Sequence, residues 1–195
     1  FCTGADGALG GLPVSGRRAL FLDRDGVIHT DCGYLYRQQD VVFTPGIFDL
    51  ARAARQRDYA LFIVTNQAGI GRGYYTEQDF HRLMDWMCGV FATESAAIKR
   101  VYFCPSHPEH GLGPYKIESP FRKPAPGMIL QAAREFGVEI PRSLLIGDKL
   151  TDIEAGIAAG VGCNVLFRAS GTEHVPASTP CVLVNRLCDA IEFLQ

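Results

Sequence analysis

Short runs of apolar residues recur along the chain, and most are followed at once by charged, amide or glycine residues. Apolar runs of this kind are typical of strands that are buried on both faces of a parallel sheet. The pattern therefore predicts strands at 19–23, 59–64, 100–103, 143–146, 163–167 and 182–184.

Between these runs lie segments in which apolar residues keep the spacing of a helix with one buried face. Thr76 is a favourable N-cap residue, and acidic residues follow it. Pro126 fits the start of a helix, and Gly137 fits its end. The glycines at 69–73 indicate a loop. We expect helices at about 47–57, 77–95, 127–137, 150–160 and 186–194.

This alternation of strands and helices predicts an α/β fold, a Rossmann-like three-layer α/β/α sandwich with a mainly parallel sheet. The chain has 195 residues, and the segments after the first and third strands are too short for a large cap domain. We expect a single domain over 19–195 after a flexible Gly-, Ala- and Ser-rich lead-in at 1–18. Residues 104–121, rich in Pro, Gly and His, should form an irregular loop over the site.

Four polar clusters stand out against this pattern, and three of them directly follow an expected strand. Ligands of such sheets bind beyond the carboxyl ends of the strands, so these clusters should share one site. The fourth cluster opens a helix after the irregular loop. The clusters are Asp23 with Asp25, Thr65-Asn66-Gln67, Arg122-Lys123, and Asp148-Lys149.

The paired aspartates suit the hydrolysis of a phosphate ester. Asp23 can attack phosphorus and form an aspartyl-phosphate. Asp25 lies two residues further along an extended backbone, so it can protonate the leaving oxygen and later take a proton from water. Carboxylates this close repel each other, and Mg²⁺ held by Asp23, the backbone carbonyl of Asp25 and Asp148 would relieve that repulsion.

The remaining clusters can complete such a site. Lys123 fits a fixed cation that offsets charge on the transferred group, while Thr65 and Asn66 can hold its oxygens. Each cluster also has an ordinary structural explanation: a turn, a helix cap at Asp148, or a solvated pair at Arg122 and Lys123. Their order and their positions at strand ends favour the shared site.

Composition narrows the classes of function. The formal net charge is −2, which does not indicate a nucleic-acid surface, and no apolar run reaches the length of a membrane span. The seven cysteines are scattered without a CxxC pair, which indicates reduced thiols and a cytoplasmic protein. We therefore expect a small-molecule substrate, no nucleic-acid or membrane partner, and a monomer or small homo-oligomer.

The clusters resemble the four motifs of the haloacid dehalogenase (HAD) superfamily of Mg²⁺-dependent phosphotransferases. FLDRDGVI resembles the first motif, TNQAGIGRG the second, RKPAPGM the third and GDKLTDIEAG the fourth, and the match covers residues 19–167. The resemblance implies a HAD-type fold. It also implies the catalytic and metal-binding roles given above for Asp23, Asp25, Thr65, Lys123 and Asp148.

Within the superfamily, the motifs are most similar to the group that contains D-glycero-D-manno-heptose 1,7-bisphosphate 7-phosphatase and histidinol-phosphatase. The DxGY sequence at 31–34 and CPxHP at 104–108 add to this similarity, and the heptose enzyme is the better match. The resemblance implies that Arg122 recognises the substrate. It also implies that the substrate site is lined by Asp31, Gly33, Tyr34, Asn66, Gln67 and Lys149.

Members of that group often carry a zinc loop between the second and third motifs, and this chain departs from it. Cys104 and His107 remain, but Ser106 stands where many relatives have a zinc-binding histidine. The Cys-x-Cys half before Arg122 is absent and reads Ser-Pro-Phe. Because structural zinc usually needs four nitrogen or sulfur ligands, we expect Mg²⁺ and do not expect Zn²⁺.

The leading hypothesis is a Mg²⁺-dependent phosphatase that acts on a sugar phosphate, namely heptose 1,7-bisphosphate at C7, in the supply of cell-surface polysaccharide precursors. The alternatives are a histidinol-phosphatase, a polynucleotide 3′-phosphatase and a non-catalytic binding module. A polynucleotide enzyme requires a basic track, which the charge balance does not favour. A binding module has no need of the second carboxylate, Asp25.

Overall fold

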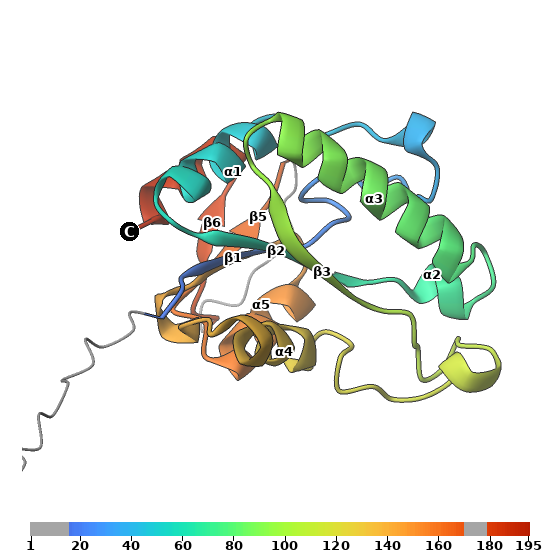
Figure 1. Ribbon diagram of the computed structural model, residues 1–195. Coiled ribbons are helices and arrows are strands. Elements are labelled where there is room, and N and C mark those ends of the chain that lie inside the picture. The colour runs from blue at the N-terminus through green and yellow to red at the C-terminus, as the bar shows by residue number, and fades with distance from the viewer. Residues whose placement is uncertain (1–15, 170–178) are drawn as a thin grey trace, which may run out of the picture.

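The computed structural model describes residues 16–169 and 179–195, and a parallel sheet of six strands lies at its centre (Figure 1). The order across the sheet is β3-β2-β1-β4-β5-β6, as in a Rossmann-like fold. The strands are β1 (Ala19–Leu22), β2 (Ala60–Asn66), β3 (Ile98–Cys104), β4 (Leu144–Gly147), β5 (Cys163–Phe167) and β6 (Val182–Val184).

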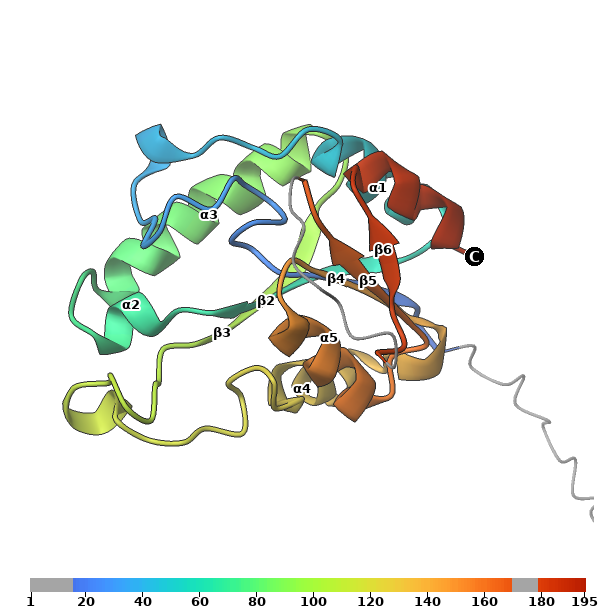
Figure 2. The same ribbon diagram turned by 180° about the vertical axis from the view of Figure 1, so that it is seen from behind.

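Helices cover both faces of the sheet and complete the expected three-layer sandwich (Figure 1 and Figure 2). One face is covered by α1 (Ile47–Gln56), α3 (Glu77–Thr93) and the 3-10 helix η4 (Leu187–Phe193). The other face is covered by α4 (Gly127–Phe136) and α5 (Leu150–Ala159). The short elements are α2 (Ala68–Gly71), η1 (Gln38–Asp40), η2 (Gly113–Tyr115) and η3 (Ile140–Arg142).

The path of the chain through the sheet decides where a ligand can bind. The chain runs from β1 outward to β3 along one half of the sheet, and then returns to β4, which lies on the other side of β1. In sheets of this kind, ligands bind where the strand order reverses, beyond the carboxyl ends of the strands. Here that position lies between β1 and β4. The loops after β1 and β4 are therefore the first place to look for a site.

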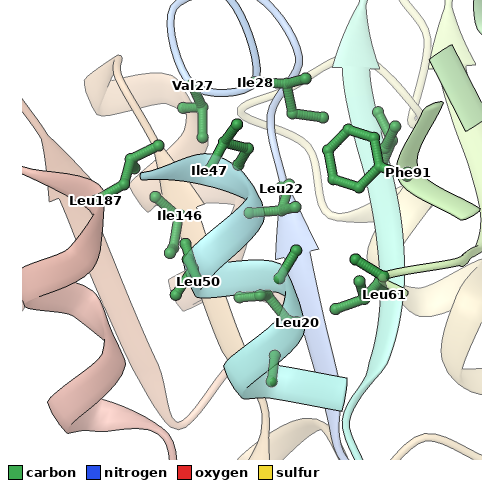
Figure 3. Close-up of a cluster of buried hydrophobic side chains, with 14 of the residues drawn as sticks. Leu20, Leu22, Val27, Ile28, Ile47, Leu50, Leu61, Phe91, Ile146 and Leu187 are labelled. Atoms are coloured by element: carbon green, nitrogen blue, oxygen red, sulfur yellow. The ribbon is translucent and has the colours of Figure 1, made fainter. Parts of the chain in front are cut away.

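The central strand β1 is buried at every position, as its apolar composition predicts. Successive side chains of a strand point to opposite faces, so Leu20 and Leu22 pack on the α1 face while Phe21 packs under α4 and α5. Figure 3 shows Leu20 and Leu22 in one cluster with Leu50 and Leu61. Truncating a buried leucine to alanine costs about 2–5 kcal/mol, so these contacts fix the strand and the residues at its end.

The helix ends follow the expected capping chemistry. Thr76 Oγ1 accepts the backbone N–H of Asp79 at 3.1 Å, and the Asp79 carboxylate accepts the N–H of Thr76 at 3.0 Å. This capping box starts α3. Gly137 and Gly160 end α4 and α5 with φ angles of +64° and +84°, a region that favours glycine.

Two elements differ from the expected pattern. Residues 68–71, expected in a loop, form the single helical turn α2. Glycine is needed there for close packing, because a Cβ on Gly71 would collide with the carbonyl oxygen of Pro105. The last element is a 3-10 helix rather than an α-helix, and its three-residue repeat aligns Leu187 and Ala190 on one buried stripe.

The segment 104–121 has little regular structure apart from the turn η2. It is attached to α2, since the backbone N–H of Leu112 donates to the carbonyl of Gly71 at 2.7 Å. The expected flexible lead-in lies outside the described residues over 1–15. At its end, the backbone N–H of Arg17 donates to the carbonyl of Gly137 at 3.1 Å. Within the described ranges, no helix has the length and apolar character needed to cross a membrane.

Candidate active site

The four polar clusters meet at the carboxyl ends of β1, β2 and β4. Asp23 follows β1, and its backbone N–H donates to the carbonyl of Ile146 in β4 at 3.0 Å. Thr65 lies in β2, and Asp148 follows β4. Lys123 comes from the loop before α4, yet its side chain reaches Asp23, 100 residues earlier in the chain. The topology thus gathers residues that are far apart in the sequence.

Lys123 is buried, and its ammonium group has three oxygen acceptors. Nζ lies 2.7 Å from Asp23 Oδ1, 2.6 Å from Asp152 Oδ1 and 2.9 Å from the carbonyl oxygen of Val64. Burial alone would lower the pKa of Lys123, but the carboxylates of Asp152 and Asp23 raise it above its usual range. The side chain is therefore a fixed positive charge beside Asp23.

Asp152, which the sequence pattern did not single out, holds Lys123 in place. Its buried carboxylate contacts Lys123 through Oδ1, and its Oδ2 accepts the backbone N–H of Lys149 at 3.0 Å. An aspartate in the first turn of a helix is usually explained by the helix dipole, so its type and position gave little signal. Its burial beside Ile153 is what separates it from an ordinary first-turn residue.

The carboxylate of Asp25 is contacted by side chains on both of its oxygens. Oδ1 accepts a hydrogen bond from Arg24 Nη2 at 2.7 Å and lies 3.2 Å from Nε2 of His29. Oδ2 accepts a hydrogen bond from Gln67 Nε2 at 2.8 Å. Burial would raise the pKa of Asp25, but Arg24 and His29 outweigh it and hold the pKa well below its usual range. Arg24 and His29 are both buried, and the sequence analysis missed them.

Asp23 and Asp148 present carboxylate oxygens to the same small space. Oxygens of Asp23, Asp148 and Asp152 lie within 4.8 Å of one another, and Asp148 Oδ1 is buried without a hydrogen-bond partner. Burial, with a contribution from neighbouring carboxylates, raises the pKa of Asp23 to about 6 and that of Asp148 to about 7. A divalent cation would supply the missing partner and offset the repulsion, so these residues fit Mg²⁺. Both oxygens of Asp152 are already bonded, which leaves Asp23 and Asp148 as the freer ligands.

The turn after β1 requires glycine at position 26. Its φ angle is +87°, which strains other residues, and a Cβ would collide with the carboxylate of Asp148. Gly26 therefore lets the chain turn sharply while Asp148 stays beside Asp23.

Thr65 and Asn66 occupy the site in different ways. The Asn66 side chain donates to the carbonyl of Lys123 and accepts its backbone N–H, each at 3.0 Å, so its amide fixes the backbone of Lys123. Thr65 Oγ1 accepts a hydrogen bond from Gln67 Nε2 at 2.8 Å. Thr65 is fully buried, and its hydroxyl group keeps a proton that it can donate.

A cavity of about 450 Å³ opens above these groups. At its rim, Asp31 accepts the N–H of Gly33 at 2.9 Å and lies 3.3 Å from Lys149 Nζ. A recess of about 40 Å³ lies at its inner end, and Asp23, Asp25 and Lys123 are among the residues that line it. The residues expected to bind substrate all line the cavity: Asp31, Gly33, Tyr34, Asn66, Gln67, Arg122 and Lys149.

The segment 104–121 borders the cavity through contacts with Arg122. Nη1 of Arg122 donates to the carbonyl of Ser106 at 3.2 Å. Nδ1 of His107 accepts the backbone N–H groups of Glu109 and His110, each at 3.2 Å, while Cys104 is buried. In the part of the chain that the structure describes, the aspartates at the inner end are the only group of three or more potential metal ligands.

Known proteins with similar sequences decide the family. The family model described as HAD-hydrolase-like matches residues 120–187. The D-glycero-alpha-D-manno-heptose-1,7-bisphosphate 7-phosphatase of Burkholderia mallei is 56% identical over 177 residues, which cover 91% of this chain and 93% of the relative. This chain belongs to the heptose-1,7-bisphosphate 7-phosphatase family of HAD-like hydrolases. The resemblance read from the four motifs is thereby confirmed.

Other members of the family extend the comparison. The D-glycero-beta-D-manno-heptose-1,7-bisphosphate 7-phosphatase of Vibrio cholerae is 44% identical over 150 residues, 77% of this chain and 81% of the relative. The crystal structure of D,D-heptose 1,7-bisphosphate phosphatase from B. bronchiseptica, complexed with magnesium and phosphate, superimposes with a TM-score of 0.75. That structure is 26% identical, and the match covers 91% of this chain and 97% of the other.

Proposed function

We propose that this protein is a Mg²⁺-dependent phosphatase that removes the 7-phosphate of D-glycero-D-manno-heptose 1,7-bisphosphate and leaves the 1-phosphate. One observation carries the proposal: the ammonium group of buried Lys123 lies 2.7 Å from the carboxylate of Asp23, at the bottom of an open cavity. The carboxylate of Asp25, which accepts a hydrogen bond from Gln67, lies beside this pair. The names of the similar proteins supply the substrate. The geometry supports the chemistry independently of those names.

In the first half of the reaction, an oxygen of Asp23 attacks phosphorus, and the bond from phosphorus to the sugar oxygen breaks. Asp25 donates its proton to that leaving oxygen, so the sugar departs as an alcohol. Lys123 and the hydroxyl of Thr65 interact with the oxygens of the transferred group and offset its charge. The free site holds Asp25 ionised, so it takes up its proton together with the substrate.

In the second half, a water attacks the aspartyl-phosphate of Asp23, and Asp25 accepts a proton from that water. Inorganic phosphate leaves, and Asp25 releases the proton that it took from water to the solvent, so both carboxylates return to their starting state. Mg²⁺, held by Asp23, Asp148 and the backbone carbonyl of Asp25, would neutralise charge on the phosphoryl oxygens.

The outer half of the cavity suits the rest of the sugar bisphosphate. Arg122 and Lys149 are cations on its wall, and Asp31 and Tyr34 lie at its rim. When the 7-phosphate occupies the recess at the inner end, the 1-phosphate of the same sugar would lie in the outer half and interact with these cations. We therefore assign the choice of substrate to this part of the cavity.

We further propose that the α anomer of the heptose is preferred over the β anomer. The relative named for the α anomer is 56% identical to this chain, against 44% for the relative named for the β anomer. The C1 group that distinguishes the anomers lies far from the reacting C7 phosphate. Anomer preference should therefore depend on the rim and leave the chemistry at the inner end unchanged.

The test is phosphate release with Mg²⁺ from a panel: both heptose bisphosphate anomers, histidinol phosphate, fructose 1,6-bisphosphate and a 3′-phosphorylated oligonucleotide. We expect the α-heptose bisphosphate to give the highest kcat/KM, with the β anomer second. A higher kcat/KM for histidinol phosphate or for the oligonucleotide would overturn the proposed substrate and keep the phosphatase chemistry. A higher value for the β anomer would overturn only the anomer assignment.

A further inference from the structure

Tyr75 places a buried hydroxyl group behind the acid/base carboxylate without touching it. Its hydroxyl donates to Gln67 Oε1 at 2.6 Å, and Gln67 Nε2 in turn donates to Asp25 Oδ2 and Thr65 Oγ1, each at 2.8 Å. Gln67 and Tyr75 are buried, at 1% and 6% exposure. A continuous chain of hydrogen bonds thus joins Tyr75 to Asp25.

A side-chain amide such as that of Gln67 can adopt two orientations related by a flip. In the observed one, the NH₂ group faces Asp25 and the carbonyl oxygen faces Tyr75. The flipped amide would present its carbonyl oxygen to Asp25, where it would accept a hydrogen bond from the proton that Asp25 must deliver. The observed orientation leaves that proton without an acceptor on Gln67.

We propose that Tyr75 is a positioning residue: by holding the Gln67 amide in one orientation, it keeps the proton of Asp25 available to the leaving oxygen. The inference rests on the proposed function, because it assigns a task to the acid/base step of that reaction. Tyr75 also lines the cavity, but no step of the proposed reaction uses its hydroxyl group.

The surroundings of Tyr75 favour a hydroxyl group that stays protonated and donates its hydrogen bond to Gln67. Arg24, which interacts with the Tyr75 hydroxyl, can only donate hydrogen bonds, and the hydroxyl proton is donated to Gln67 Oε1. Burial raises the pKa of Tyr75 to about 12, and the hydroxyl therefore keeps its proton. The ring is fixed by stacking on Tyr36 at 5.5 Å and by Gly69, where a Cβ would collide with the Tyr75 ring.

The test compares two phosphate esters whose leaving groups differ in their need for a proton. A sugar alkoxide needs a proton from Asp25 to depart, whereas the p-nitrophenolate of p-nitrophenyl phosphate departs without one. Because kcat/KM reports the steps up to departure of the leaving group, it isolates this donation. We expect Tyr75→Phe to lower kcat/KM for heptose bisphosphate by about 3- to 10-fold, and that for p-nitrophenyl phosphate by less than about 2-fold.

Two further variants show whether the effect passes through Gln67. In a Gln67→Leu background, Tyr75→Phe should add less than about a 2-fold loss, because the amide it orients is gone. Tyr36→Phe is the matched control, since it removes a hydroxyl from the stacked neighbour and should leave both esters unaffected. Thermal unfolding of each variant confirms that the fold is kept.

The outcomes separate the inference from the function on which it rests. No release of phosphate from either ester by the unmodified protein would overturn the proposed phosphatase. Turnover of both esters, with equal losses or no loss in Tyr75→Phe, would overturn the role of Tyr75 alone. A full loss from Tyr75→Phe in the Gln67→Leu background would also overturn it, because Tyr75 would then act by another route.

Discussion

The inner end and the outer rim of the cavity are built in different ways. At the inner end, Lys123 is buried and contacts two carboxylates at 2.7 and 2.6 Å. At the rim, Asp31 and Lys149 face each other at 3.3 Å, and both are exposed. Removing one partner from a buried pair is costly, whereas an exposed pair contributes little.

This difference separates two tasks of the enzyme. Transfer of a phosphoryl group requires charges and proton donors at fixed positions, whatever the alcohol attached to it. Selection of a sugar requires groups that can adjust to its shape. Substitutions at the inner end should therefore change kcat and stability, and substitutions at the rim should change KM.

The largest effect is expected from Asp23→Asn. The amide cannot act as the nucleophile, so release of phosphate from heptose bisphosphate should fall by at least about 10³-fold. The fold should remain, because asparagine fits the same space and Lys123 keeps its contacts with Asp152 and the carbonyl of Val64. Steady-state kinetics and circular dichroism check the two halves of the prediction. Normal turnover by this variant would show that another group is the nucleophile.

Asp152→Asn should have a smaller effect on activity than Asp23→Asn, and it should also lower the stability of the fold. Lys123 would lose one of its two charged partners, so the ammonium group should be less well fixed, and kcat should fall by about 10- to 100-fold. The free energy of unfolding should fall by about 3 kcal/mol in urea titrations, because a buried pair is broken. Asp189→Asn removes a partner from the exposed pair with Arg186 and serves as the control. If both variants lost equal stability, the contrast between buried and exposed pairs would not hold.

The raised pKa values of Asp23 and Asp148, about 6 and about 7, predict a dependence on pH and Mg²⁺ together. Their ordinary value is 3.8, so between about pH 4 and 7 the folded protein binds more protons than the unfolded chain. These two groups should therefore reduce the stability of the metal-free protein as pH rises through that window.

Mg²⁺ binds the ionised carboxylates, so its stabilising effect should grow over the same window. At a saturating concentration, Mg²⁺ should raise Tm by about 5 °C or more at pH 8 and by much less at pH 5. Calorimetry at both pH values, with and without Mg²⁺, provides the measurement. A Tm increase that did not depend on pH would show that the cation binds elsewhere.

The smallest effect is expected at the rim. Lys149→Met removes a cation from the cavity wall but keeps the contacts among Asp23, Lys123 and Asp152, so KM for heptose bisphosphate should rise by about 5- to 10-fold with kcat within about 2-fold. Lys116→Met, at an exposed position that does not line the cavity, is the matched control. If Lys149→Met lowered kcat and left KM unchanged, the proposed division between catalysis at the inner end and substrate selection at the rim would be contradicted.

The residues that follow strands could be found from the sequence, because their position is a property of the topology. Asp23, Thr65 and Asp148 each stand where an apolar run ends. Parallel strands point in the same direction, so these side chains must meet at one edge of the sheet. The six strands, the capping box at Thr76 and the helix ends at Gly137 and Gly160 were equally accessible, since each depends on local patterns.

The residues that support the site could not be found in this way. Asp152 is an ordinary first-turn residue until its contact with Lys123 is seen, and that contact joins α5 to the loop before α4. His29 and Tyr75 have no periodic pattern of their own, and their hydrogen-bond chemistry depends on burial created by the whole fold. The helical turn α2 was missed because glycine favours loops, whereas here its small size permits close packing.

The two hydrogen bonds between the Asn66 side chain and the backbone of Lys123 fasten the lysine directly to the end of β2. These bonds join two residues that are 57 positions apart, and the whole irregular segment lies in the stretch between them. That segment could be shortened, lengthened or exchanged between relatives as an interchangeable module. A protein engineer could graft a new recognition loop between Cys104 and Phe121 and keep the same hydrolytic machinery underneath it.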